Sequence, residues 1–301
     1  MTQPHLNTES PAVAEPDFVS NQVSEARRFY LNMNPPAEKP LTVVCGGVER
    51  MREDYHVARQ EFPYYAIEWV AEGQGDLHLD ERRFLLEPGM MFAYGPRTPH
   101  RIAGGDTNRM RKYYVDFAGH DAEQQLEHSG LLAGRPLRIT RMHEVIELFA
   151  SMDREARSDG QLTHDICDLL LRLMFLKIRQ RGVPYGTGVP RAYATYEKIR
   201  THIEQNFRTL QTVQEVARAC DITPIHLSRL FRRFAGMGAY QYLLKQKMEL
   251  ATELLIREGL LVKEVAKQLG FADAFQFSRA FKRVYGVSPK QMAESHRQDE
   301  I

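Results

Sequence analysis

The sequence has few cysteines and lacks any long run of apolar residues. Its three cysteines, Cys45, Cys167 and Cys220, are odd in number and far apart, so they indicate no zinc or redox pair and are expected to be reduced thiols of a cytoplasmic protein. No apolar run approaches the ~18 residues that a membrane helix needs, so we expect no membrane partner. The N-terminus lacks the basic start and apolar core of a secretory signal, and residues 1–22 are predicted to be a disordered tail.

The chain also has little net charge, +1 over 301 residues, but its charges are unevenly distributed. Residues 191–301 contain 18 Lys and Arg against 12 Asp and Glu, whereas residues 1–190 contain 22 against 27. The C-terminal third is therefore basic, which is compatible with a nucleic-acid partner, although an asymmetry of this size does not establish one.

The patterning divides the chain into a strand-rich part and a helical part. Short apolar or alternating runs broken by Gly and Pro-Gly turns predict strands over 41–118, at the spacing of a small antiparallel barrel or sandwich. Two segments within 141–181 have a helical period, and the second carries a broad apolar stripe that could complete a core or form a dimer interface. Residues 182–190, GVPYGTGVP, are predicted to be a linker. The chain reads as helical from 191 to about 295.

One phrase occurs twice in the helical part. VQEVARACDITPIHLSRLFRRFAG begins at Val213, and VKEVAKQLGFADAFQFSRAFKRVYG begins at Val262. The identical positions are 49 residues apart at first and 50 residues apart after the middle. The second copy thus has one extra residue, and since a change of length is tolerated in a turn, each copy is predicted to be helix, turn, helix.

The second helix of each copy has a clear inner face. Apolar residues recur there at i, i+3, i+4 and i+7, as expected of core positions. These positions are Leu227, Leu230, Phe231 and Phe234 in the first copy, and Phe277, Ala280, Phe281 and Val284 in the second. Ala217 and Ala266 are small where the helices of each copy would cross. Pro224 suits the first turn of a helix, and Gly270 suits a helix C-terminus.

The outer face of each second helix carries side chains that can contact DNA. Arg, Gln and Ser can bond base edges, and Lys and Arg can hold phosphates. One such helix could equally be a solvated basic face, but two copies of it favour a DNA reader. The predicted DNA-binding residues are Ile225, His226, Ser228, Arg229, Arg232 and Arg233 in the first copy and Gln276, Ser278, Arg279, Lys282 and Arg283 in the second. About 19 helical residues between the copies would span roughly 28 Å, close to the ~34 Å between successive major-groove faces of B-DNA.

The second copy, VKEVAKQLGFADAFQFSRAFKRVYGVSPKQM, resembles the signature of the AraC/XylS family of bacterial transcription regulators through its Gly-Phe, Phe-Ser-Arg-x-Phe-Lys and Gly-x-Ser-Pro elements. The resemblance covers about 195–295. It implies seven helices, in which the second helix and the region of the sixth and seventh form the two readers. It also implies that the base readers are Ile225, Ser228 and Arg229 in one unit and Gln276, Ser278 and Arg279 in the other.

The strand-rich part also resembles the cupin-like sensor domain of that family, through LLEPGMMFAYGPRTPHRI. A small barrel commonly takes one ligand in its interior. Aromatic faces and polar tips for an effector would come from Tyr64, Trp69, His78, Tyr94 and His100. The residues His56, His78, His100 and Glu68 could instead suggest a cupin metal site, but no two of these histidines share a strand face, so we expect no metal, no cofactor and no catalytic residue.

These observations predict an α+β multidomain protein. An N-terminal cupin-like β-barrel with two following helices, residues 23–181, would bind effector and form a homodimer. The linker 182–190 would lead to a C-terminal all-α domain, 191–295, with two helix-turn-helix units. The expected function is a cytoplasmic, ligand-responsive regulator, an activator by family resemblance, that binds promoter DNA and a small polar metabolite, with a sugar favoured, and contacts RNA polymerase. The alternatives are a metal-dependent cupin enzyme with a DNA-binding tail and a constitutive DNA-binding protein without an effector.

Overall fold

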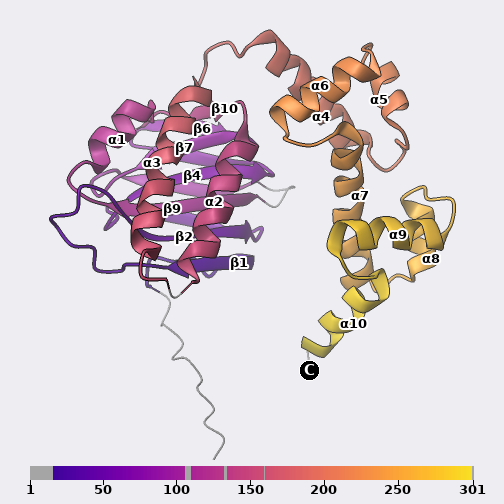
Figure 1. Ribbon diagram of the computed structural model, residues 1–301, viewed down its shortest axis with the longest axis horizontal. Coiled ribbons are helices and arrows are strands. Elements are labelled where there is room, and N and C mark those ends of the chain that lie inside the picture. The colour runs from indigo at the N-terminus through magenta and orange to yellow at the C-terminus, as the bar shows by residue number, and fades with distance from the viewer. Residues whose placement is uncertain (1–15, 106–109, 132–133, 159, 300–301) are drawn as a thin grey trace, which may run out of the picture. The chain divides into compact units, whose positions relative to one another are not determined.

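The computed structural model describes residues 16–105, 110–131, 134–158 and 160–299, and the chain divides into two compact units. The first contains residues up to 139 together with 148–185, and the second contains 140–147 together with 186 onward. Figure 1 shows the first as sheets with helices and the second as helices alone. This confirms the predicted α+β class. Within the described ranges, no helix is long and apolar enough to cross a membrane.

The first unit contains two antiparallel sheets. One has the strand order β1-β2-β9-β4-β7-β10-β11 and the other has the order β3-β8-β5-β6. The strands of the larger sheet are β1 (Val23–Tyr30), β2 (Thr42–Met51), β4 (Tyr65–Glu72), β7 (Met90–Tyr94), β9 (Arg111–Ala118), β10 (Leu137–Ile139) and β11 (Gly182–Pro184). The smaller sheet consists of β3 (His56–Arg59), β5 (Gly75–Leu79), β6 (Arg82–Leu86) and β8 (His100–Gly104).

The central strands of the larger sheet, β2, β9, β4 and β7, are buried on both faces. One face is covered by helices α2 (Met142–Ala156) and α3 (Thr163–Arg181), which lie across it in Figure 1. Trp69 of β4 stacks on Tyr113 of β9, and both rings pack edge-on against Phe149 of α2. Side chains alternate along a strand, so the strand neighbours of Trp69 and Tyr113, such as Glu68, face the smaller sheet. The helix α1 (Ala122–Ser129) follows β9.

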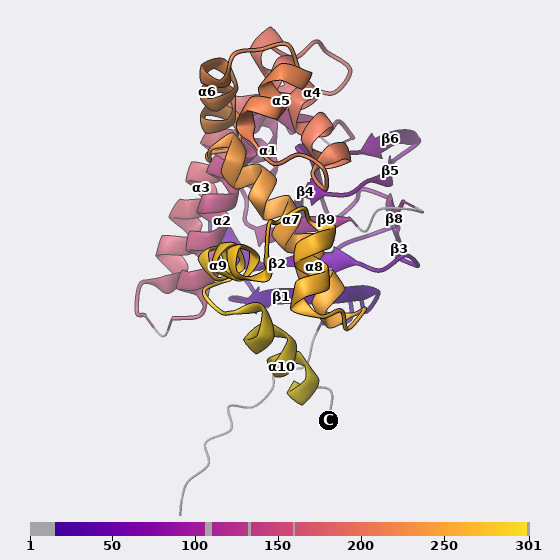
Figure 2. The same ribbon diagram turned by 90° about the vertical axis from the view of Figure 1, so that its right-hand side faces the viewer.

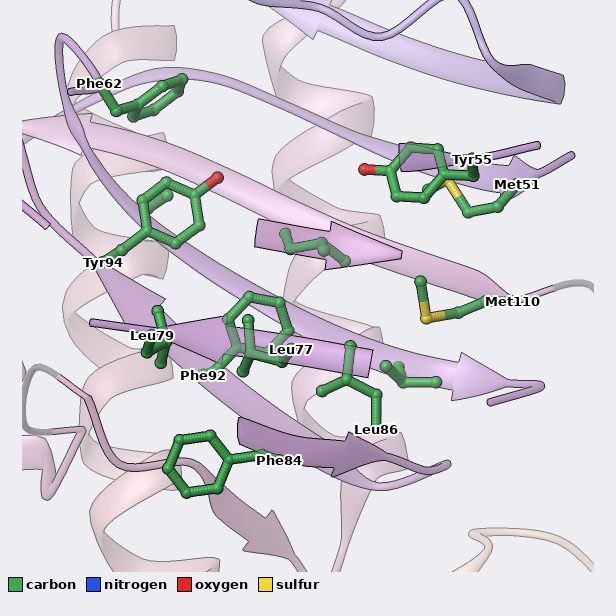
Figure 3. Close-up of a cluster of buried hydrophobic side chains, with 13 residues drawn as sticks. Met51, Tyr55, Phe62, Leu77, Leu79, Phe84, Leu86, Phe92, Tyr94 and Met110 are labelled. Atoms are coloured by element: carbon green, nitrogen blue, oxygen red, sulfur yellow. The ribbon is translucent and has the colours of Figure 1, made fainter. Parts of the chain in front are cut away.

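The space between the two sheets is filled mainly by apolar side chains, which form the core of the barrel (Figure 3). Leu77 and Leu79 of β5 and Phe92 of β7 are almost fully buried there. The apolar filling gives way near Tyr94, Phe62 and Tyr55, where polar groups share the space. The interior of the barrel is therefore apolar at one end and partly polar at the other.

Three features of this unit differ from the expectations. The strand β1 was not anticipated, because VSEARRFY is polar and its middle residues are exposed on an edge strand. Residues 182–184 of the predicted linker pair with β10 as β11, so the connection to the next helix is shorter than predicted. Residues 16–22 of the predicted tail are ordered against the barrel, with Phe18 packed on Phe62, while residues 1–15 lie outside the described ranges.

The second unit contains seven helices in its described residues. They are α4 (Arg191–Asn206), α5 (Val213–Ala219), α6 (Pro224–Phe234), α7 (Ala239–Ile256), α8 (Val262–Gln268), α9 (Ala274–Tyr285) and α10 (Pro289–Asp299). Figure 2 shows α7 running from the α4–α6 group to the α8–α9 pair. One core joins α4, α5, α6 and the start of α7, and a separate core joins the rest of α7 to α8 and α9.

Candidate nucleic-acid interface and effector chamber

Both repeats fold as helix, turn, helix, as their sequences predict, and their first helices end in the same way. The N–H of Ile222 donates to the carbonyl of Ala217, and the N–H of Phe271 donates to the carbonyl of Ala266. These are the six-to-one bonds of a Schellman motif, which requires a left-handed residue just before the final donor. Gly270 supplies it in the second repeat with φ of 72°, and Asp221 supplies it in the first with φ of 53°.

The second helices begin at capped residues. Thr223 accepts the N–H of His226 at the start of α6, and Pro224 occupies the first turn, as predicted. Asp273 accepts the N–H of Gln276 at 2.7 Å at the start of α9. The extra residue of the second repeat is therefore Ala272, which lies in the turn between the Schellman donor and the cap.

The predicted inner faces of α6 and α9 are largely buried. Leu227, Leu230, Phe231 and Phe234 of α6 and Phe277 and Phe281 of α9 are core residues. Ala280 is only half-buried and Val284 is 37% exposed, so the inner face of α9 is narrower than predicted. The second helices of the two repeats, or recognition helices, are the third and sixth helices of the unit. The helix α9 therefore lies in the expected sixth-to-seventh region, whereas α6 is the third helix and not the expected second.

The outer faces present the predicted DNA-binding residues to solvent. All eleven are exposed except Ser228 and Ser278, which are half-buried. Ile225 at the start of α6 is 75% exposed and Phe275 at the start of α9 is 69% exposed, as apolar groups that meet base edges would be. The Ser278 hydroxyl donates to the carbonyl of Ala274, so in this conformation only its lone pairs are available to a base.

Cationic side chains on the two recognition helices form no ion pair with any carboxylate that the structure describes. In the described part of the chain, no carboxylate lies within ion-pair distance of any of the following: Arg229, Arg232, Arg233, Arg279, Lys282 and Arg283. The Arg279 guanidinium lies 5.6 Å from the ring centre of Phe275. Positive charges on two equivalent helices that no carboxylate neutralises are the pattern expected of a surface that binds a phosphate backbone. Which of the eleven residues contact DNA remains a prediction.

A polar chamber occupies one end of the barrel, between the two sheets. Its cavity of about 30 Å³ has room for one or two water molecules. Apolar residues at its edge come from the ordered N-terminal segment and the loop after β3. The lining residues are Phe18, Val19, Ser20, Glu49, Tyr55, Arg59, Phe62, Glu68, Tyr94, Lys112, Tyr114 and Asp116.

A buried ion pair forms the centre of the chamber. The Lys112 ammonium donates to one oxygen of Glu68 at 2.6 Å, and the Tyr94 hydroxyl donates to the other oxygen at 2.6 Å. Burial raises the pKa of Glu68, but Lys112 and the two hydrogen bonds hold it below its ordinary value. The same pairing outweighs burial at Lys112 and raises the pKa of its ammonium. Both groups are therefore charged at neutral pH.

Two further groups of the chamber, Asp116 and Tyr114, can form hydrogen bonds. Burial raises the pKa of Asp116 to about 7, and the Cys45 thiol, which donates to it at 3.2 Å, only partly opposes this shift. The Tyr114 hydroxyl is buried without a hydrogen-bond partner in the described structure. A buried polar atom without a partner is costly and is commonly satisfied by water or a ligand. The chamber therefore offers both charged and neutral hydrogen-bonding groups.

The structure brings together only part of the predicted effector set. Tyr94 lines the chamber, and the His100 ring stacks on it with centroids 3.8 Å apart. Tyr64 packs on Phe18 at the chamber's edge and donates its hydroxyl to the carbonyl of Met33. Trp69 lies on the helix-covered face of the sheet.

The remaining member of the set, His78, alternates with the buried Leu77 and Leu79 and therefore faces away from the barrel interior. Effector contact by all five predicted residues remains a prediction. The polar residues Glu68, Lys112, Asp116 and Tyr114 also line the chamber and are not among the residues that the sequence predicts for effector contact. A pairing of β4 with β9 would have shown them on one face, but the sequence gives no register.

Two of the barrel histidines, His56 and His78, lie away from Glu68. His78 faces outward, His56 is exposed on β3, and Glu68 is held by Lys112. Within the described ranges, no group of three His, Cys, Asp or Glu side chains is placed to hold a metal ion.

Comparison with known proteins accounts for both units. A model of AraC-like ligand binding domains matches residues 44–173, and a model of helix-turn-helix domains matches residues 216–295. The Msm operon regulatory protein of Streptococcus mutans is 23% identical over 258 residues, which cover 83% of this chain and 91% of that protein.

Two other relatives align over much of the chain. The MmsAB operon regulatory protein of Pseudomonas aeruginosa is 22% identical over 270 residues, 88% of this chain and 86% of that protein. The lactose operon transcription activator of Staphylococcus xylosus is 23% identical over 211 residues, 69% of this chain and 73% of that protein. Both units match models of regulators and the aligned relatives are operon regulators, so the chain is a DNA-binding transcription regulator, not an enzyme, and belongs to the AraC family.

Proposed function

We propose that the barrel senses a small polar, uncharged metabolite, with a sugar as the favoured class, and that binding changes how the helical unit engages promoter DNA. The observation that carries this proposal is the polar chamber with its unpartnered Tyr114 hydroxyl. Hydroxyl-rich ligands donate and accept at once, which matches a carboxylate–ammonium pair beside phenol groups. The lactose operon activator among the relatives supports the same ligand class and an activating role.

The size of the chamber limits how an effector could enter. A cavity of about 30 Å³ cannot hold a metabolite, so Phe18–Ser20, which line it, or the Phe62 loop must move. The rings of Phe62 and Tyr64 both pack against Phe18 at this edge. The effector would therefore bind by selecting an opened state, at an affinity reduced by the cost of opening.

The experiment is a thermal-shift and calorimetric screen of the full chain against sugars and other small polar metabolites. A ligand found in this way is then titrated into Tyr114→Phe and into Tyr113→Phe, which alters the helix-covered face instead. The proposal expects a loss of affinity of tenfold or more for Tyr114→Phe alone. If no small polar metabolite raises the melting temperature, a constitutive DNA-binding protein becomes the better account.

We also propose that a second copy of the chain covers the exposed face of α3. Large apolar residues repeat there at intervals of four, three, four and three, which is the seam of a two-stranded coiled coil. They are exposed by 37–65% and comprise Leu162, Ile166, Leu169, Leu173 and Leu176. The first turn carries Asp165 and the last turn Arg179 and Arg181, so an antiparallel pairing about a two-fold axis brings opposite charges together.

The oligomeric state of the full chain tests this second proposal. Sedimentation of Leu169→Glu should give a monomer where the unaltered chain gives a dimer. Leu85→Glu, at a residue 48% exposed on β6, is the matched control and should remain a dimer. A monomeric unaltered chain would contradict it. Cytoplasmic location and contact with RNA polymerase are part of the same proposed role at promoters.

A further inference from the structure

Lys247 is a buried lysine at the centre of the helical unit. It lies midway along α7 and is 3% exposed. Burial lowers the pKa of Lys247 to about 8, partly opposed by the charge of Glu215. Lysine is almost never fully buried unless it is paired, and neither of the groups that receive its hydrogen bonds is a carboxylate.

The two acceptors of Lys247 belong to different helix-turn-helix units. Its ammonium donates at 2.7 Å to the carbonyl of Leu269, the residue that ends α8 in the second helix-turn-helix. It also donates at 3.2 Å to the side-chain carbonyl of Gln211, which directly precedes the cap of α5 in the first helix-turn-helix. One ammonium group thus bridges the start of one unit to the end of the first helix of the other.

The two helix-turn-helix units pack around different apolar cores. Their cores are separate clusters, and α7 contributes Leu243 to one and Leu244 to the other. Lys247 follows at the boundary. The Gln211 side chain also lies against Gly270, where a Cβ added to the glycine would come within 2.1 Å of the Gln211 amide nitrogen. The turn that follows α8 in the second helix-turn-helix therefore contacts Gln211, in the loop before α5 of the first helix-turn-helix.

We infer that Lys247 is a positioning residue that holds the two recognition helices at one separation and so sets the spacing of the two half-sites that one protomer reads. The 18 residues of α7 span about 27 Å, and bending or twisting at mid-helix would move α6 relative to α9. The hydrogen bonds of Lys247 to both units oppose that movement. An apolar side chain of similar length would fill the space without joining the units.

The test uses full-length protein and an operator selected from random DNA. Affinities are measured for DNA with both half-sites at the selected spacing, with one base pair inserted or removed between them, and with a single half-site. Wild-type protein is expected to favour the selected spacing by tenfold or more over the altered ones. Lys247→Met should bind all three spacings within about threefold of one another and bind the single half-site as wild type does.

Matched variants separate positioning from folding. Lys245→Met removes a 43%-exposed lysine from the same helix and should leave the spacing preference intact. Lys247→Arg, which can still bridge, should restore most of it. Gln211→Ala removes one acceptor and should weaken the preference in the same direction, which keeps the inference testable if Lys247→Met does not fold. An unchanged spacing preference, or an equal loss on all sites including the single half-site, would overturn the inference.

Discussion

Replacing Lys112 by Met would leave the Glu68 carboxylate buried beside an apolar side chain. The pair is almost dry, with the Lys112 and Glu68 side chains 6% and 3% exposed. After the substitution, the Tyr94 hydroxyl would still donate to Glu68 but would bring no compensating charge. Removing one partner of a buried ion pair costs about 3–5 kcal/mol, because the other charge is left uncompensated. We expect this loss in the stability of the barrel unit.

The double variant Glu68→Leu/Lys112→Met supplies the comparison. Replacing a whole buried pair by apolar groups is often neutral or stabilising, so the double variant should be more stable than Lys112→Met by about 2 kcal/mol or more. The assay is urea unfolding followed by tryptophan fluorescence. Trp69 is the only tryptophan and neighbours Glu68 on β4, so the signal reports this unit rather than the helical one.

The deficit of Lys112→Met should depend on pH in a defined direction. Without Lys112, burial dominates and raises the pKa of Glu68 above its unfolded value. Below the unfolded pKa, near 4.3, both states bind the proton and the penalty is absent, and it grows as the pH rises. The variant should therefore approach wild type near pH 4 and fall furthest behind above pH 7. A loss under 1 kcal/mol at pH 7, or a loss independent of pH, would refute this account of the pair.

Four other substitutions have defined outcomes. Asp116→Asn should stabilise the protein at pH 8 and have little effect at pH 4. The folded pKa of Asp116, about 7, lies above its unfolded value, so the unaltered protein loses stability between these two values as the pH rises. Equal effects at both pH values would contradict this expectation. Arg229→Ala should cost about 1–3 kcal/mol on the operator and much less on random DNA, whereas Arg232→Ala should weaken both and lower the salt slope by about one; equal losses on both DNAs for Arg229→Ala would make it a phosphate contact. Asp273→Ala should cost about 1 kcal/mol in thermal unfolding by removing the α9 cap, against no change for the exposed Lys282→Ala.

The helical unit was largely predictable because its information is local. Helix periodicity, Pro224 in the first turn of α6, and Gly270 after α8 each act over a few residues, and the repeat supplied an internal check. What the sequence did not reveal was Lys247, whose acceptors Gln211 and Leu269 are 36 and 22 residues away. Such a contact depends on tertiary packing, and a lysine on a helix reads as a solvated residue.

The barrel was predicted in outline, but its chamber was not. Glu68 and Trp69 are neighbours in sequence and face opposite sides of the sheet, so a residue chosen for its chemistry had an even chance of facing the wrong way. The register of β4 on β9, which pairs Glu68 with Tyr114 and Trp69 with Tyr113, decides the matter. The sequence predicted effector contacts mainly from aromatic residues, whereas a charged residue such as Lys112 is expected on a solvent-exposed surface.

A linkage titration can show whether effector and DNA affect each other's binding to this chain. A ligand shifts DNA binding only by its differential affinity for two states of the protein. Effector affinity is therefore measured for the full chain, free and bound to operator. We expect operator DNA to change effector affinity by a coupling of about 1–3 kcal/mol, and effector to change operator affinity by the same factor. Identical effector affinities in the two cases, with unchanged operator affinity, would contradict this coupling.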